Sequence, residues 1–351
     1  MHPQYLIIGQ GIAGTLLSYE FWKQDRSFFL IDEPHNISKA SLVAGAIINP
    51  INVNRWTTVH EHESYISTAL QTYRDLEKDL GVSLIKEMSM LVFHGERQKE
   101  LFKKARSYSS GYVHPPGRED IARVNRSFAS KYDVVKVAPV WKIYAEQLLS
   151  AWSGFLKSKN LLKEEFFHAD ECVIAPGGVA FKEIRAEKII FCEGAKAINN
   201  PLFKKLPFTR NRGEALLLSV PDLPGSYIYH YGIRLVPAAK DLWWCGSNYR
   251  WAFSDLSPDP GWRMQTEALL RQWLTVPFKV VDHVVAERPT TEGQQFLAGI
   301  HPAMPSAAIF NGLGTKGFLC GPLLAKALSK MLIDPHRTTS STVKPLDKWL
   351  R

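Results

Sequence analysis

The stretch YLIIGQGIAG at residues 5–14 decides the fold of this chain. Its first four residues are apolar, as expected of a parallel strand that is buried on both faces. An apolar-rich helical pattern follows and continues to about Lys23, and a second apolar run covers residues 28–31. Strand, glycine turn, helix and strand in this order predict a βαβ unit that binds a dinucleotide.

Each glycine of the turn has a physical role in such a unit. Gly9 allows the tight exit from the strand, Gly11 lets the backbone approach a pyrophosphate, and Gly14 lets the helix pack closely on the sheet. The helix N-terminus offers free N–H groups to phosphate, and Asp32 can accept hydrogen bonds from ribose hydroxyls. The alternative is a glycine-rich turn without a ligand. The predicted dinucleotide contacts are Gly9, Gly11, Ile12, Ala13, Gly14, Asp32 and Glu33.

Length and composition are those of an ordinary globular protein. The chain has 351 residues, 45% of them hydrophobic, which suggests about two domains. It carries 43 basic and 34 acidic residues, a formal net charge of +9, and the basic residues are scattered. This charge favours a mildly basic solvated surface, with a nucleic-acid partner as the alternative.

The cysteines and histidines do not suggest a disulfide framework or a metal centre. Four cysteines lie far apart in apolar surroundings, which is typical of small buried side chains in a reducing compartment. The segment His60-Glu61-His62 would place its two histidines on different faces of a helix, so a helix-start turn is favoured over a metal site. No apolar run approaches the roughly 20 residues of a membrane span. No signal peptide precedes the first strand, and we expect a cytoplasmic location.

Three further stretches identify a family resemblance. They are KASLVAGAIINP at residues 39–50, ERPTTEG with FLAG at 287–299, and IFNGLGTKGF at 309–318. Together with the dinucleotide unit, they resemble the D-amino acid oxidase family of flavoproteins, which includes glycine oxidase and sarcosine oxidase. The resemblance implies an α/β fold: a Rossmann-type FAD/NAD(P)-binding domain of the GR2 flavoprotein type, joined to an antiparallel-sheet α+β substrate domain. It also implies FAD as the cofactor.

The resemblance assigns roles to residues in these stretches. Arg288 would bind the substrate carboxylate, and a charge such as that of Lys316 would stabilise the reduced flavin. Arg234 stands where relatives have a tyrosine, which would suit a second acidic group on the substrate. No cysteine corresponds clearly to the flavin-linked cysteine of sarcosine oxidases, so we expect non-covalent FAD. The further implied flavin contacts are Ser41, Gly45, Ala46, Ile47, Val173, Gly194, Ala195, Gly312, Leu313, Gly314, Thr315 and Lys316.

The resemblance also predicts a discontinuous organisation. The FAD domain is expected at residues 1–60, 140–210 and 285–351, and the substrate domain at residues 61–139 and 211–284. Hydrophobic periodicity predicts a long amphipathic helix over residues 141–160 and further helices at about 61–80, 96–107 and 262–274. A hairpin is expected at 167–184, and antiparallel strands at 214–220, 226–236, 242–247 and 278–286.

The expected activity is oxidation of an amine next to a carboxylate. Hydride transfer to flavin N5 would give an imine that water hydrolyses, with reoxidation by oxygen or another acceptor. One alternative is action on a carboxymethylaminomethyl group of tRNA, because residues 41–50 and 312–317 also look like the flavin domain of the tRNA 5-methylaminomethyl-uridine biosynthesis enzyme. Another is an FAD-binding subunit of a larger redox complex.

Overall fold

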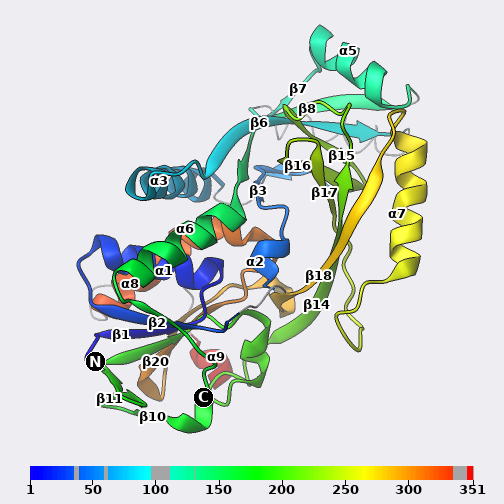
Figure 1. The fold of residues 1–351 in the computed structure, drawn as a ribbon. Helices are drawn as coiled ribbons and strands as arrows, with labels where there is room; N and C mark the ends of the chain where they lie inside the picture. The colour runs from blue at the N-terminus through cyan, green and yellow to red at the C-terminus, as the bar shows by residue number, and fades with distance from the viewer. Residues whose placement is uncertain (35–38, 59–61, 96–110, 131, 335–345, 351) are drawn as a thin grey trace.

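A computed structural model describes residues 1–34, 39–58, 62–95, 111–130, 132–334 and 346–350 (Figure 1). The described chain forms two large sheets, one in the upper and one in the lower part of the view, and helices pack on both. No helix of the described part is long and apolar enough to cross a membrane.

A six-stranded sheet carries the dinucleotide unit. Five of its strands are parallel, and the edge strand β19 is antiparallel to β20. Its strands, in spatial order, are β19 (Leu297–His301), β20 (Met304–Asn311), β13 (Lys188–Phe191), β1 (Tyr5–Ile8), β2 (Phe28–Asp32) and β9 (Leu162–Glu164).

Both faces of this sheet are buried, as the apolar run of β1 predicts. Tyr5 and Ile7 point into the core beneath the helices, while Leu6 and Ile8 point into the core on the opposite face. The helices are α1 (Ile12–Lys23), α3 (His62–Leu80), α6 (Ala145–Ser158) and α8 (Gly317–Ile333). The opposite face packs against β10 (Cys172–Ala175), β11 (Gly178–Phe181), β12 (Ile184–Ala186) and α9 (Asp347–Leu350).

The second sheet has nine strands and is antiparallel except for the pair β15 and β6. Helix α7 (Pro260–Trp273) covers its outer face through Leu270 and Trp273, and α5 (Arg118–Ser127) lies at its far end (Figure 1). The strands are β3 (Ile47–Ile48), β6 (Ile85–His94), β7 (Val113–His114), β8 (Asp133–Ile143), β14 (Phe208–Ser219), β15 (Tyr227–Tyr231), β16 (Ile233–Ala239), β17 (Leu242–Gly246) and β18 (Lys279–Thr291).

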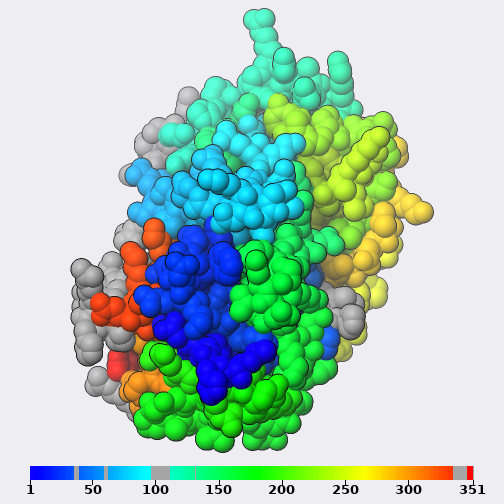
Figure 2. All heavy atoms as spheres, turned by 60° about the vertical axis from the view of Figure 1, so that its left-hand side comes forward, coloured from blue at the N-terminus to red at the C-terminus, as the bar shows by residue number. Residues whose placement is uncertain are grey.

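Two long strands connect the sheets. β14 and β18 pair from Phe208 and Thr291 at one end to Ser219 and Lys279 at the other, and Figure 1 shows them running from the upper unit down to the lower one. Shorter elements are α2 (Ala40–Val43), β4 (Ile51–Asn52) and β5 (Thr57–Thr58), and Ile51 of β4 packs in a core cluster with residues of β6 and β8. In Figure 2, residues from the beginning, the middle and the end of the chain share one face around α1.

The secondary structure corrects two predictions. The helix expected over 141–160 begins only at Ala145, because Trp141 belongs to β8 and pairs with Ile48 and Glu87. The strand expected over 226–236 is a hairpin, β15 and β16, that turns at Gly232 with φ +65°.

Other predicted elements are confirmed. Helices α3 and α7 lie where helices were expected, and β10 pairs with β11 as a hairpin, although it begins at Cys172 rather than at residue 167. The helix expected at 96–107 and most of the His60-Glu61-His62 segment lie outside the described residues. The domain boundaries stay a prediction. The predicted FAD domain contains β3 and the end of β18, and both belong to the nine-stranded sheet.

Candidate active site

A cavity of about 790 Å³ lies between the two sheets. It extends from the carboxyl ends of β1 and β2 to the inner face of β14, β16 and β17 and the end of β18. Its volume is within the range of cofactor and ligand sites, about 300–1,000 Å³. Its position outside the carboxyl ends of parallel strands is the one that open α/β sheets use for ligands.

The glycines of the predicted turn shape one end of the cavity. Gly9 has φ +100°, and a Cβ on Gly14 would lie 1.8 Å from the Gly9 carbonyl oxygen. Helix α1 therefore starts directly against the end of β1. No side chain caps this helix from its N-cap residue Gly11, while Ser41 Oγ accepts a hydrogen bond from the Ile12 N–H at 3.0 Å. The N-terminus of α1 thus faces the cavity with donors suited to phosphate.

The acid at the end of β2 is held in place by its neighbours. Asp32 is buried, and its Oδ1 accepts a hydrogen bond from the Gln10 N–H at 2.8 Å, while Oδ2 pairs with Lys39. Glu33 pairs with Lys196 at 2.6 Å. Ion pairing fixes both carboxylates at the cavity wall, where Asp32 can accept from the hydroxyls of a ribose.

The middle of the cavity is built by the segment after β2. Trp244 Nε1 donates to the Val43 carbonyl oxygen at 2.8 Å, and a Cβ on Gly45 would lie 2.8 Å from the Trp244 ring. Gly45 therefore lets the segment pass flat over the indole. Ala46 then adopts φ +45° before Ile47 enters β3. This segment lies across the inner face of the nine-stranded sheet and contains the predicted flavin contacts Gly45, Ala46 and Ile47.

The ends of β13 and β20 close the opposite wall. Asn311 joins them, because its Nδ2 donates to the Gly194 carbonyl oxygen at 2.9 Å and its Oδ1 accepts from the Gly312 N–H at 2.8 Å. Gly312 has φ +70° and Gly314 has φ +53°, so the chain can turn here into α8. Leu313, Gly314 and Thr315 present this turn to the cavity.

Arg288 lies on β18 at the end of the cavity away from Asp32. Its Nη1 donates to Asn211 Oδ1 at 2.5 Å, and its Nη2 donates to Ser247 Oγ at 2.8 Å. The guanidinium stacks on the Tyr249 ring at 4.7 Å. A Cβ on Gly213 would lie 1.8 Å from Nη2, so the side chain needs a glycine to pass over β14. Neutral partners thus fix the geometry of the arginine without neutralising it.

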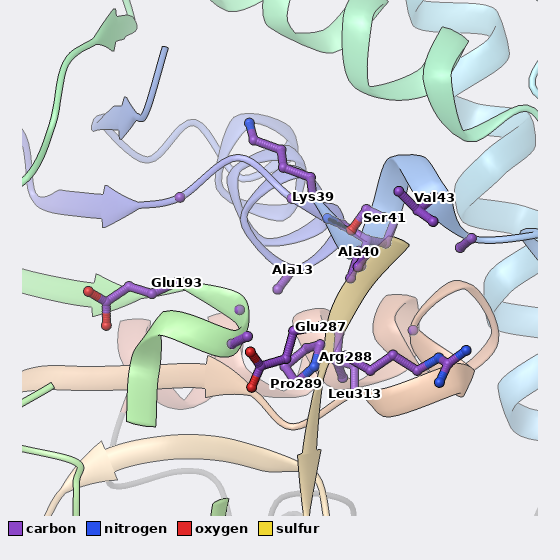
Figure 3. A pocket seen from close by; sticks show the side chains of 18 of the residues that line it. Ala13, Lys39, Ala40, Ser41, Val43, Glu193, Glu287, Arg288, Pro289 and Leu313 are labelled. Carbon is purple, nitrogen blue, oxygen red and sulfur yellow. Dashed lines mark hydrogen bonds between the residues drawn. The ribbon is translucent and has the colours of Figure 1, made fainter. Parts of the chain in front are cut away.

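The charge of Arg288 has no carboxylate partner among the described residues. The adjacent Glu287 instead pairs with Arg210 at 2.9 Å, and Figure 3 shows Glu287 and Arg288 projecting to different sides of β18. Burial lowers the pKa of Arg288, and the nearby Tyr249 acts in the opposite direction. An arginine stays protonated despite such a shift, so the site holds a partly desolvated positive charge.

Arg234 is a second arginine in the wall of the same cavity. It lies on β16 opposite His230 of β15 and Gly246 of β17. Burial lowers its pKa, with Tyr249 again acting in the opposite direction. The guanidinium groups of Arg234 and Arg288 therefore line the same cavity, and Tyr249 is near both.

Most of the predicted site residues come together in this cavity. Gly14 and Gly312 lie behind the wall and shape the backbone there. The predicted residues that line the cavity are Gly9, Gly11, Ile12, Ala13, Asp32, Glu33, Ser41, Gly45, Ala46, Ile47, Gly194, Ala195, Arg234, Arg288, Leu313, Gly314 and Thr315.

Two predicted contacts lie outside the cavity wall. Val173 is 66% exposed, because alternation along β10 turns Cys172 and Ile174 toward the core and Val173 away from it. Phe166 and Phe167, which follow β9, line the cavity instead. Lys316 is exposed at the turn before α8, where the backbone on either side of it reaches the cavity and its side chain does not line it.

Several residues of the site were missed by sequence reasoning. Asn211, Ser247 and Tyr249 contact Arg288 from strands and loops far away in the chain, and no local pattern marks them. Trp244 could have been found from the sequence. Neighbouring residues of a strand point to opposite faces, so one of Trp243 and Trp244 had to face the cavity side of β17.

Cys192 lines the cavity, and burial raises the pKa of its thiol well above the usual value. Cys320 is buried in α8, and burial raises its thiol pKa to about 12. None of the four cysteines forms a disulfide. In the described part of the chain, no group of three or more His, Cys, Asp or Glu side chains could hold a metal ion.

The residues present fit FAD. The cradle of Gly9, Gly11 and the start of α1, whose N-cap residue has no side chain, suits a pyrophosphate. Asp32 suits the adenosine ribose, and the segment at Gly45 with the turn at Gly314 leaves room for a flat ring system between the sheets. Arg288, with its unpaired charge, lines the same cavity.

Known proteins share this architecture. The family model DAO, described as FAD dependent oxidoreductase, matches residues 4–331. Glycine oxidase from Geobacillus kaustophilus has a similar structure, with a TM-score of 0.80, 18% identity and 96% of each chain covered. Iminodiacetate oxidase from Chelativorans sp. BNC1 gives a TM-score of 0.77, 18% identity and 98% coverage of each chain.

A third similar structure is NikD, an amino acid oxidase essential for nikkomycin biosynthesis, with a TM-score of 0.75, 15% identity and coverage of 98% of this chain and 97% of that one. The TM-scores of these three structures support the fold. The family match over almost the whole chain supports FAD-dependent oxidation or reduction as the class of reaction. The chain therefore belongs to the DAO family of FAD-dependent oxidoreductases.

Proposed function

We propose that the protein oxidises the C–N bond of an amino acid or secondary amine that carries a carboxylate. The observation that supports this proposal is Arg288, an oriented cation at the end of the cavity with neutral hydrogen-bond partners. The similar structures include proteins named as oxidases of glycine, iminodiacetate and an amino acid.

Arg288 binds the carboxylate and so fixes the position of the neighbouring C–H and amine. A planar guanidinium suits a two-point grip on a carboxylate, and Asn211 and Ser247 hold its plane before the substrate arrives. Orientation of this kind contributes to the rate by keeping the reacting atoms at contact distance.

The bound flavin supplies the acceptor for the two electrons and the hydrogen that leave the substrate C–H bond. The amine nitrogen lone pair forms the C=N bond of the product imine, and water then hydrolyses the imine to an oxo compound and an amine. Oxygen or another acceptor removes the two electrons afterwards.

The carboxylates near Arg288 are already engaged. Glu214 accepts hydrogen bonds from Asn248 at 3.0 Å and from the Asp259 N–H at 2.8 Å, and Glu287 pairs with Arg210. We therefore expect the amine to bind in its neutral form, which needs no strong general base. Cys320, buried in α8, supports non-covalent FAD.

Substitution of Arg288 tests the proposal. Arg288→Met removes the carboxylate grip, and we expect the substrate dissociation constant for anaerobic flavin reduction to rise about 30- to 900-fold, since a buried charged contact contributes about 2–4 kcal/mol. Arg288→Lys keeps a charge but loses the two-point geometry and should give an intermediate value.

The matched control is Arg263→Met, because Arg263 lies on α7 and pairs with Glu267 away from the cavity. It should leave the dissociation constant unchanged. A normal dissociation constant in Arg288→Met, with full FAD content, would remove Arg288 from the substrate site. Loss of flavin reduction with every small amine, but not with tRNA bearing a carboxymethylaminomethyl group, would favour the tRNA alternative.

A further inference from the structure

The Arg234 guanidinium is a partly buried charge without a partner among the described residues. Arg234 makes no side-chain hydrogen bond or ion pair with any described residue, and its Nε is buried without an acceptor. Burial of an arginine without an anion is costly because the group loses its hydration. Since Arg234 lines the cavity, a ligand in the cavity can supply the missing anion.

The groups around Arg234 do not offer that anion. His230, its neighbour across the hairpin, has its pKa lowered to about 3 by burial and by the Arg234 charge, so its ring is neutral. Glu214, the acid that lines this part of the cavity, is held by Asn248 and by the Asp259 N–H and lies 3.4 Å from Arg212. The described surroundings of Arg234 are therefore neutral or already paired.

Arg234 and Arg288 face the same small volume. The Arg288 side chain passes over Gly213 of β14 and reaches Ser247, which follows β17. Gly246, the residue before Ser247, pairs directly with Arg234 on β16. The Arg288 guanidinium thus binds the residue next to the strand partner of Arg234. Tyr249 acts on the charges of both arginines.

The phosphates of the cofactor are not the anion for Arg234. The pyrophosphate cradle lies at Gly9 and the start of α1, on the six-stranded sheet, whereas Arg234 lies on the nine-stranded sheet across the cavity. The part of the cavity between the two arginines is also bounded by Val236, Trp244 and Ala215.

We infer that the preferred substrate is an amine with two carboxylates, one bound by Arg288 and the second by Arg234. This inference rests on the proposed function for the amine chemistry, and on Arg234 for the second anion. A monocarboxylate would satisfy Arg288 and leave Arg234 without an anion, so the pocket favours a ligand with a second carboxylate.

Matched ligand pairs test the inference on the FAD-loaded protein. Iminodiacetate and sarcosine differ by one carboxylate, and so do glutarate and butyrate, which have no amine to oxidise. Binding is followed by the change in the visible flavin spectrum under anaerobic conditions. We expect each dicarboxylate to bind about 10- to 100-fold more tightly than its partner, as a charge-assisted hydrogen-bonded contact implies. The preference should shrink at high salt.

Substitution of Arg234 then tests whether this residue causes the preference for dicarboxylates. Arg234→Met should reduce the dicarboxylate preference to less than about 3-fold and leave sarcosine and butyrate binding nearly unchanged. Arg234→Lys should retain part of the preference, and Arg288→Met should weaken all four ligands. FAD content and the unliganded flavin spectrum of each variant show that the site is intact.

The outcomes separate this inference from the proposed function. Equal binding of glutarate and butyrate by the wild-type protein would overturn the inference, even if sarcosine reduces the flavin. An unchanged preference in Arg234→Met would overturn it as well. If no amine reduces the flavin while the glutarate preference depends on Arg234, the second anion site stands and the proposed amine chemistry fails.

Discussion

Single residues at the two ends of the cavity carry opposite charges, and each is oriented by partners that leave it able to bind a ligand. Asp32 is buried at the end of β2 and accepts the Gln10 N–H, and Arg288 on β18 donates to Asn211 and Ser247. Asp32 was predictable, because its position depends only on the local βαβ unit. The partners of Arg288 were not, because they come from β14 and from the residue after β17, whose register no local pattern gives.

Asp32→Asn should weaken FAD binding by about 10- to 100-fold, the effect of one charge-assisted hydrogen bond. Asparagine still accepts the Gln10 N–H but offers no charge to Lys39 or to a ribose hydroxyl. Titration of the apoprotein with FAD, followed by flavin fluorescence, measures the affinity. Asp282→Asn, on an exposed part of β18, is the control and should bind FAD normally. Equal affinities in the two variants would contradict the role of Asp32.

His230 predicts a pH dependence of stability. Burial and the Arg234 charge lower its pKa to about 3 in the folded protein, whereas an unfolded histidine titrates near 6.5. The unfolded chain therefore binds the extra proton first as the pH falls below 6.5, and stability declines. His230→Gln should reduce the decline between pH 6.5 and 4.5 by about 2 kcal/mol, measured by urea unfolding at both pH values. An identical decline in the variant would show that His230 titrates normally.

Secondary-structure elements differ in how well the sequence foretells them. The unit β1, α1 and β2 follows from its apolar runs and glycines. The start of α6 was misplaced, because Trp141 continues the apolar periodicity of the helix although it pairs within β8. The hairpin of β15 and β16 was read as one strand, because Gly232 is the only turn signal in a continuous run of strand-forming residues. In both segments the pairing of strands that are apart in the chain determines the structure, and the local sequence pattern does not show which strands pair.

The close contact between helix α1 and strand β1 can be tested by substitution of Gly14. Gly14→Ala would place a Cβ 1.8 Å from the Gly9 carbonyl oxygen, so α1 must shift and the phosphate cradle opens. We expect loss of FAD binding together with a destabilisation of about 1–3 kcal/mol, the range for overpacking. Thermal unfolding and FAD content measure the two effects.

Gly154→Ala is the matched control. Gly154 lies in α6, and a Cβ there would meet no atom within 4 Å. Alanine in a helix interior is favoured over glycine by about 0.5–1 kcal/mol, so this variant should be slightly more stable and bind FAD normally. If Gly14→Ala behaved like Gly154→Ala, the close approach of α1 to β1 would be wrong.

At the scale of the whole molecule, the cavity wall is shared between both sheets. Gly9 and Asp32 come from the six-stranded sheet, and Arg234 and Arg288 come from the nine-stranded one. The predicted domain boundaries place Arg288 in the FAD domain, whereas β18, which carries it, belongs to the nine-stranded sheet. The part of the cavity between the arginines depends on the order of β18, β14, β17 and β16, which the middle of the sequence does not reveal.

Because FAD would contact both sheets, it should stabilise the molecule as a unit. At a free FAD concentration about 100-fold above the dissociation constant, the free energy of unfolding should rise by about 2.7 kcal/mol. Thermal unfolding of apoprotein and FAD-loaded protein checks this, and a single transition should move to higher temperature. Two transitions, of which FAD moves only one, would show that the nine-stranded sheet does not contribute to the cofactor site.

The most direct test of the central claim is the visible absorption spectrum of the FAD-loaded protein, followed anaerobically while amino acids and N-substituted amino acids are added one at a time. We expect the absorption bands of oxidised flavin, and we expect an amine that carries a carboxylate to bleach them. A protein that binds no flavin even when FAD is supplied would contradict the cofactor assignment. Bound flavin that stays oxidised with every such amine would contradict the proposed reaction.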